Sequence, residues 1–142
     1  NELVTFKGKW HDLDDVGINP LPLQCPIPIW FGGAADAVMQ RIGEMGDGWI
    51  YPGSYPFPEK QSKTMLKSIK NSANQANRSM NEIGIEKILS ESEKPTDGWA
   101  DSVKLWIEFG ATHLSINTMG ANLISVNRHL DALESFINEI IQ

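Results

Sequence analysis

Apolar positions along the chain fall into short continuous runs and longer stretches with helical spacing. Residues 27–31 form an apolar run without polar alternation, which is typical of a strand covered on both faces. Apolar residues then recur every three or four positions from 35 to 45, as on one face of a helix. The same order predicts further strands at 49–51, 83–89 and 113–117, and further helices at 58–76, 97–109 and 126–141.

Glycine and capping residues stand where these elements are expected to begin and end. Gly46 and Gly110 follow the last apolar positions of two predicted helices, where glycine often terminates a helix. Asp97 stands at the position of a helix N-cap. The first strand, helix and strand fit within about 25 residues, which favours a right-handed parallel crossover over an antiparallel excursion.

Four strands, each followed by a helix, predict an α/β fold. Alternating units of this kind build either an open doubly wound sheet or a closed eight-stranded barrel of about 250 residues. At about 29 residues each, four units match half of such a barrel. We therefore predict one partial barrel domain over residues 1–142, with its four β/α units in residues 26–142.

Residues 1–25 precede the four units as a hairpin and a proline-rich connector. The hairpin is predicted from extended segments at 2–6 and 9–13, with Gly8 in the turn between them. The connector carries three prolines within residues 19–26, which favour an extended backbone and disfavour ordinary strand pairing.

Charge and hydropathy argue against several classes of partner. The net charge is -6, and the 12 basic residues are scattered, so we expect no nucleic-acid partner. Lys60, Lys63, Lys67 and Lys70 recur at helical spacing and are interpreted as a solvated helix face. No apolar run approaches the roughly 20 residues needed to cross a bilayer, and no leader opens the chain, which favours a cytoplasmic protein with no membrane partner. Because the chain starts with Asn1, we expect a truncated sequence.

Residues suited to metal binding or nucleophilic catalysis are sparse. Cys25 is the only cysteine, so we expect a buried or half-buried thiol without a disulfide or a metal. His11, His113 and His129 lie on different elements without the spacing of a metal site. His113 also opens a strand, the end opposite to the active sites of β/α barrels. No serine or cysteine has the surroundings of a nucleophile elbow.

Ligands of parallel α/β proteins bind at the carboxyl ends of the strands. Gly32 and Gly33 follow the first of these strands, and they lack a Cβ just before a helix whose first N–H groups are free. This arrangement suits a phosphate group, although glycine also serves such turns for steric reasons alone. Asp47 is predicted to bond to a turn and Trp49 to lie in the core. The strand ends to inspect are residues 32–36, 51–54, 90–92 and 117–121.

Three segments resemble the C-terminal half of the luciferase-like flavin monooxygenase superfamily. They are VTFKGKWHDL, NPLPLQCPIPIWFGGAADAVMQRIGEMGDGWIYP and GATHLSINTMG. The most specific part is a P-x-W-x-G-G strand end followed, one helix later, by D-G-W at the start of the next strand. The resemblance spans nearly all 142 residues.

The resemblance implies that the four strands are the fifth to eighth of a (β/α)8 TIM-type barrel that binds FMN or the deazaflavin coenzyme. In that family the loop after the GG strand holds the cofactor phosphate, often through serine, where this chain has Ala34 and Ala35. Phosphate binding would then rest on backbone N–H groups and the helix dipole. The candidate cofactor-binding residues are Gly32, Gly33, Ala34, Ala35, Thr118 and Gly120.

Two functions of different classes follow from this reasoning. The first is part of a flavin- or deazaflavin-dependent oxidoreductase or monooxygenase, which transfers hydride between the cofactor and a small organic substrate. The second is a non-catalytic half barrel, a binding or assembly module that is inactive without the missing N-terminal half. A different phosphate-binding barrel is a third alternative. Because a half barrel leaves two sheet edges unpaired, we expect pairing with a second copy or with the missing half. No catalytic residue is predicted.

Overall fold

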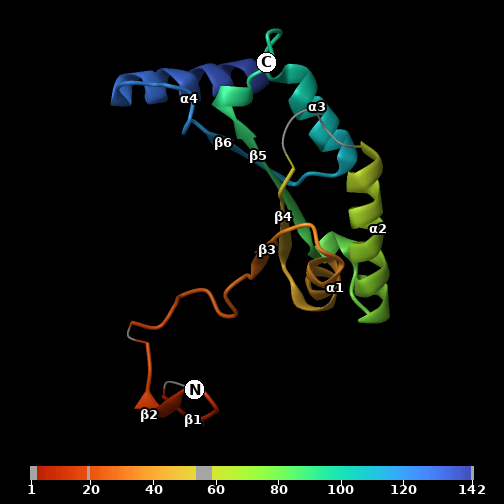
Figure 1. Ribbon diagram of the computed structural model, residues 1–142, viewed down its shortest axis with the longest axis vertical. Coiled ribbons are helices and arrows are strands. Elements are labelled where there is room, and N and C mark those ends of the chain that lie inside the picture. Colours follow the sequence, from red (N-terminus) through yellow and green to blue (C-terminus); the bar gives the residue numbers. More distant parts are fainter. Residues whose placement is uncertain (1–2, 19, 54–58, 142) are drawn as a thin grey trace.

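The computed structural model describes residues 3–18, 20–53 and 59–141 of the chain (Figure 1). Within them, the predicted order of four strands, each followed by a helix, is confirmed. Residue 58, where the second helix was predicted to begin, lies outside the described residues. The elements are β1 (Val4–Lys7), β2 (Asp12–Val16), β3 (Trp30–Gly32), α1 (Asp36–Met45), β4 (Gly48–Tyr51), α2 (Glu59–Gln75), η1 (Met80–Glu82), β5 (Gly84–Ser90), η2 (Glu91–Glu93), α3 (Ala100–Phe109), β6 (His113–Asn117) and α4 (Val126–Ile140).

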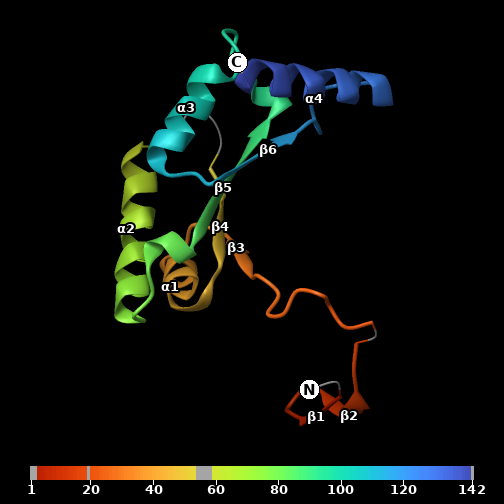
Figure 2. The same cartoon turned by 180° about the vertical axis from the view of Figure 1, so that it is seen from behind.

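The strands β3, β4, β5 and β6 form one parallel sheet in that spatial order. Consecutive strands are therefore neighbours, with β3 and β6 at the two edges. Helices α1, α2 and α3 lie along one side of the sheet in both Figure 1 and Figure 2. All four helices contribute side chains to one core, among them Met39, Ile42, Met65, Ile69, Val103, Trp106 and Phe136.

The pleat of the strands separates a helix-covered face from an open one. In β4, Trp49 and Tyr51 are buried against the helices, whereas Ile50 between them is only half-buried. In β5, the buried residues are Ile85, Lys87 and Leu89, and the side chains between them face away from the core. The predicted burial of Trp49 is confirmed. The other face of the sheet has no helix over it within the described chain.

Close packing of α1 on α2 depends on Gly43. A Cβ at this position would lie 2.6 Å from the Ala73 nitrogen and 2.6 Å from the Ile69 carbonyl oxygen. Ser72 Oγ donates to the Gln40 carbonyl at 2.9 Å, across the same contact. The absence of a side chain at Gly43 therefore lets the backbones of α1 and α2 approach each other closely.

The first sheet strand is shorter than predicted from residues 27–31. It covers only Trp30–Gly32, because prolines at 26 and 28 have no N–H for the ladder. The N–H of Ile29 instead donates to Asp47 Oδ2 at 2.7 Å. Asp47 therefore has a structural role, as predicted, but its partner is the connector backbone beside the start of β4 and not a turn.

The third helix begins later than predicted, and Asp97 is not its N-cap. The helix starts at Ala100 with Trp99 as the capping residue, and Trp99 makes no side-chain capping bond. Gly98 has a φ of +94°, outside the helical region, and so separates Asp97 from the helix. The side chain of Glu139 on α4 accepts the Trp99 N–H instead.

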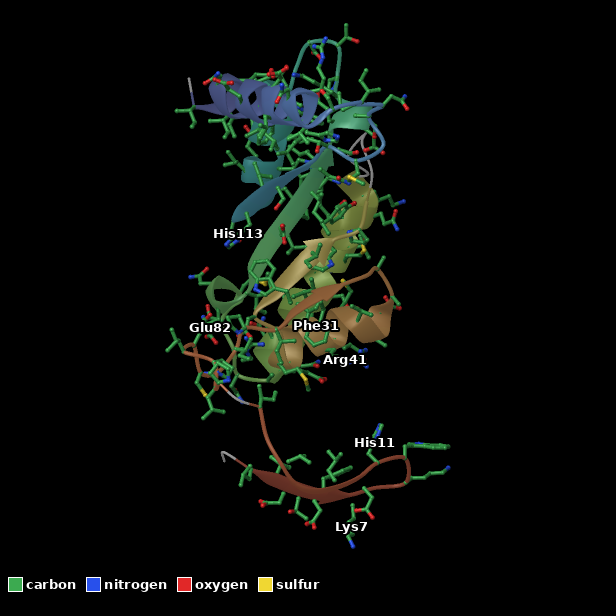
Figure 3. All side chains as sticks on the ribbon, turned by 90° about the vertical axis from the view of Figure 1, so that its left-hand side faces the viewer. Lys7, His11, Phe31, Arg41, Glu82 and His113 are labelled. Carbon is green, nitrogen blue, oxygen red and sulfur yellow. The ribbon has the colours of Figure 1, made fainter. Side chains whose placement is uncertain are left out.

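The predicted hairpin is present but starts its second strand later. The Gly8 N–H donates to the His11 carbonyl at 2.8 Å, so the turn extends to His11 and β2 begins at Asp12. Figure 3 shows Lys7 and His11 on this hairpin, away from the sheet that carries Phe31 and His113. The residues of β1 and β2 are all exposed.

Two further expectations concern the connector and the membrane. Cys25 is exposed, so the prediction of a buried or half-buried thiol was wrong. The reason is that the connector runs away from the helix-covered core (Figure 1). Across the described residues, no helix combines the length and the apolar character needed to span a membrane. The cytoplasmic location stays a prediction.

Candidate functional site

The Gly32-Gly33 turn lies at the carboxyl end of β3, where the sequence predicted a ligand-binding turn. Gly33 has a φ of +133°, a conformation that favours glycine. A Cβ on Gly32 would meet no atom within 4 Å, so the backbone there is open to an approaching group. Gly33 thus allows the backbone conformation of the turn, and Gly32 leaves its backbone accessible to a ligand.

The turn is connected to the core through Trp49. The ring of Trp49 is fully buried, and its Nε1 donates to the Gly33 carbonyl at 3.0 Å. The strand that follows in the sequence therefore fixes the conformation of the turn. This contact links the two motifs, GG and DGW, on which the family resemblance rested.

The helix that follows the turn offers free backbone donors. Ala35 is the N-cap of α1 and provides no side-chain bond. Within the described residues, the N–H groups of Ala34 and Ala35 have no hydrogen-bond acceptor, and both residues are exposed. Together with the helix dipole they form a positive site for an anion. Asp36 in the first turn of α1 carries a negative charge and opposes part of this effect.

The last strand ends in a second turn, where a hydroxyl group is in contact with an imidazole ring. Thr118 Oγ1 lies 2.7 Å from His129 Nδ1 on α4, and both residues are half-buried. Asn117 Oδ1 accepts the Met119 N–H at 2.9 Å, and Gly120 has a φ of +77°. This geometry brings Thr118 and Gly120 to the rim of the sheet.

Serines that were not among the predicted site residues lie beside this turn. Ser90 ends β5, and its Oγ lies 2.8 Å from Ser92 Oγ. A Cβ on Gly120 would be 4.0 Å from Ser92 Oγ, so the loops after β5 and β6 touch. Their signal in the sequence was a Ser-x-Ser at residues 90–92, at the carboxyl end of a predicted strand.

The structure does not bring all the predicted residues together. The glycines and alanines at residues 32–35 follow one edge strand, whereas Thr118 and Gly120 follow the other. Three strand spacings of about 4.8 Å separate the two groups along the sheet, or about 14 Å. A ligand that contacts both groups must span the rim of the sheet.

Lys87 is a buried cation in β5, on the helix-covered face of the sheet. Its Nζ donates to the Gly53 carbonyl, at the end of β4, and lies 5.7 and 5.5 Å from the ring centres of Tyr51 and Trp106. Burial lowers the pKa of Lys87, and the negative charge of Glu93 partly offsets this effect. The lysine thus holds the backbone at the carboxyl end of β4 in place.

The described residues contain no group of three or more histidine, cysteine or acidic side chains placed to hold an ion. His113 stands at the start of β6, with its ring edge-on to Trp30 at 4.9 Å between ring centres. The prediction that His113 lies at the end of the sheet opposite the site is confirmed.

A family model for luciferase-like monooxygenases matches residues 1–134 of the chain. Similar curated proteins include uncharacterized proteins of Mycobacterium bovis and Mycobacterium tuberculosis, each 28% identical over 142 residues. The match covers 96% of this chain but only 45% of each relative, so the chain spans about half the length of these proteins.

Two solved structures share the fold. One is a coenzyme F420 dependent tetrahydromethanopterin reductase from Methanopyrus kandleri, with a TM-score of 0.69 and 15% identity over 97% of this chain and 57% of that chain. The other is an F420-dependent secondary alcohol dehydrogenase in complex with an F420-acetone adduct, with a TM-score of 0.69 and 14% identity over 99% of this chain and 56% of that chain. The architecture is therefore that of four β/α units, half of a TIM-type barrel.

Proposed function

The chain belongs to the luciferase-like monooxygenase family, and we propose that it forms part of an oxidoreductase that uses FMN or a deazaflavin coenzyme. The observation that carries this proposal is the turn after β3, with open space over Gly32 and free N–H groups at Ala34 and Ala35. Both solved structures named above are of F420-dependent proteins, which supports a cofactor of the flavin type.

The residues of the turn fit a phosphate group held by main-chain donors. Two free N–H groups at a helix N-terminus bind an anion without a basic side chain. The alanines supply no hydroxyl, so the Gly33 turn and its bond from Trp49 would determine the direction of the donors. The hydroxyls of Ser92 and Thr118 at the other edge are available to more distant polar groups of the ligand.

When bound, a cofactor of this type supplies the hydride transfer to or from a small organic substrate. The part played by this chain is to hold the phosphate at Ala34 and Ala35, and to fix the rim through Lys87 and the Gly53 carbonyl. Completion of the site by a further half barrel is part of the proposal, since the chain spans 45% of its curated relatives.

One observation favours the second candidate, an assembly module without catalysis. The open face of the sheet and the two edge strands have no partner within the described chain. On this alternative, the chain pairs with another half barrel and binds no cofactor. The two candidates differ in cofactor affinity, which can be measured directly.

The test is to titrate the purified chain with FMN and, separately, with a deazaflavin coenzyme, and to measure the affinity for each from the change in fluorescence. Ala35→Pro removes one free N–H at a residue whose φ of -74° suits proline. Loss of one charge-assisted bond should weaken binding by about tenfold or more. Gly33→Val is a poorer test, because its φ of +133° strains the variant with or without ligand.

Ala34→Ser is the matched variant in the same turn. It retains every N–H and adds a hydroxyl, so it should tighten binding or leave it unchanged. Equal affinity of wild type and Ala35→Pro would remove this turn from the site. Failure of the wild-type chain to bind either cofactor would favour the assembly module.

A further inference from the structure

The open face of the sheet carries its own set of side chains. The register places Trp30, Gly48 and Gly84 side by side in one row across β3, β4 and β5. The next row toward the carboxyl ends contains Ile50, Glu86 and His113. In parallel strands, residues paired in this way project to the same face. These side chains therefore face away from the helix-covered core.

The indole ring of Trp30 covers the whole first row. A Cβ on Gly48 or on Gly84 would collide with the indole of Trp30, so both glycines make room for it. The ring reaches across the face to His113, which it meets edge-on. The amino-terminal part of the open face is thus already covered by an apolar side chain, as at the closed end of a barrel interior.

Glu86 follows directly in the second row. It is half-buried, and its carboxylate accepts a hydrogen bond from Ser115 Oγ on the neighbouring strand. Within the described residues it has no ion pair. The paired neighbour on the other side is the apolar Ile50. The polar requirement of this carboxylate is only partly met by the chain itself.

A partner that covers this face would take Glu86 out of water. A buried carboxylate is strongly disfavoured unless a cation pairs with it, and one hydroxyl donor does not replace that cation. On the same face, His113 is paired with Glu86 in register, but its Nδ1 lies 2.8 Å from Thr112 Oγ1, and within the described residues it makes no ion pair with Glu86. The basic side chain on the same strand, Lys87, lies on the opposite face and is occupied with the Gly53 carbonyl. A lysine or arginine for Glu86 is therefore left to the partner.

We infer that the open face binds a second β/α half barrel that presents a lysine or arginine to Glu86, and that a second copy of this chain is disfavoured. Two copies that close a symmetrical barrel would place their Glu86 side chains in the same layer, where like charges repel. A half barrel of different sequence fits the share of the relatives that this chain leaves uncovered, since it covers 45% of them. The inference concerns the interface and does not depend on cofactor binding.

A charge swap tests the inference with this chain alone. Tagged Glu86→Lys protein is mixed with untagged wild type, so that one copy supplies the cation that the other requires. We expect a heterodimer at least about tenfold tighter than either homodimer, measured by sedimentation velocity and by co-purification on the tag. The control is Glu134→Lys, which makes the same charge change at an exposed position of α4.

Three results would overturn the inference. They are a wild-type homodimer as tight as the mixture, equal pairing with the Glu134→Lys control, and no heterodimer between folded proteins. Circular dichroism establishes that each variant is folded. If Glu86→Lys does not fold, Glu86→Gln replaces it and should self-associate more tightly than wild type, because the facing charges are gone. No gain in self-association would then refute the inference, whatever the outcome of the cofactor titrations.

Discussion

Replacing Trp49 with phenylalanine tests the connection between the core and the candidate site. Its ring is fully buried, and its Nε1 donates to the Gly33 carbonyl at 3.0 Å. Trp99 provides a matched control, because it is equally buried but its Nε1 has no hydrogen-bond partner in the described structure. Both substitutions remove the same atoms, and only the first removes a hydrogen bond to the turn.

The expected costs follow from this difference. Loss of part of the indole reduces the free energy of unfolding by about 2 kcal/mol at either position. At Trp49 the lost hydrogen bond adds about 1 kcal/mol, for a total of about 3 kcal/mol. At Trp99 the removal of an unsatisfied buried N–H returns about 1 kcal/mol, which leaves a cost of about 1 kcal/mol. The two variants should therefore differ by about 2 kcal/mol.

Urea unfolding followed by circular dichroism measures the two free energies, and fluorescence titration measures cofactor affinity. Trp49→Phe should lower both stability and affinity, because it releases the Gly33 turn, whereas Trp99→Phe should lower stability alone. The reasoning is refuted if Trp99→Phe costs as much as Trp49→Phe. An unchanged affinity of Trp49→Phe would show that the turn is not held through this bond.

Three further changes have expected outcomes that thermal or urea unfolding can check. Burial lowers the pKa of Lys87, so the folded protein releases this proton at a lower pH than the unfolded chain does. Wild type should therefore gain stability relative to Lys87→Met as the pH rises from the lowered pKa toward 10.5. A constant difference in stability over this range would contradict the burial effect. Gly43→Ala should cost about 1–3 kcal/mol, because its Cβ would lie 2.6 Å from the Ala73 nitrogen, whereas the same change at Gly110, which has open space but a φ of +106°, should cost only its backbone strain. Burial would raise the pKa of Glu139, but the Trp99 N–H and Lys94 lower it, so the folded state favours the charged carboxylate. Glu139→Gln should therefore lower stability at neutral pH, and the difference from wild type should disappear in acid, where the wild-type carboxylate is protonated. A difference that persists in acid would exclude the charge as its source.

The order of the elements could be predicted because it depends on local patterns. The apolar runs and the helical spacing identified the four β/α units, and glycine marked the turn at Gly33. The structural role of Asp47 also followed, since an aspartate beside a turn commonly hydrogen-bonds to the backbone. These signals are contained in a few neighbouring residues, and the structure confirms them.

Contacts between distant segments could not be predicted in this way. Gly98 separates Asp97 from α3 by its conformation, and the partner that replaces the cap comes from α4. The connector carries Cys25 away from the core, so that its thiol is exposed. Both outcomes depend on how distant segments are placed in space, which no local pattern records.

The two faces of β5 show what the chain provides and what it requires. Lys87 and Glu86 are adjacent in sequence and both lie in β5. The pleat directs Lys87 into the helix layer, where the Gly53 carbonyl and two aromatic rings satisfy it, and directs Glu86 onto the open face with one hydroxyl donor. The helix face is therefore complete within this chain, and the open face is not. If cofactor binding proves weak for the chain alone, the unmet charge at Glu86 indicates what a completing half must supply.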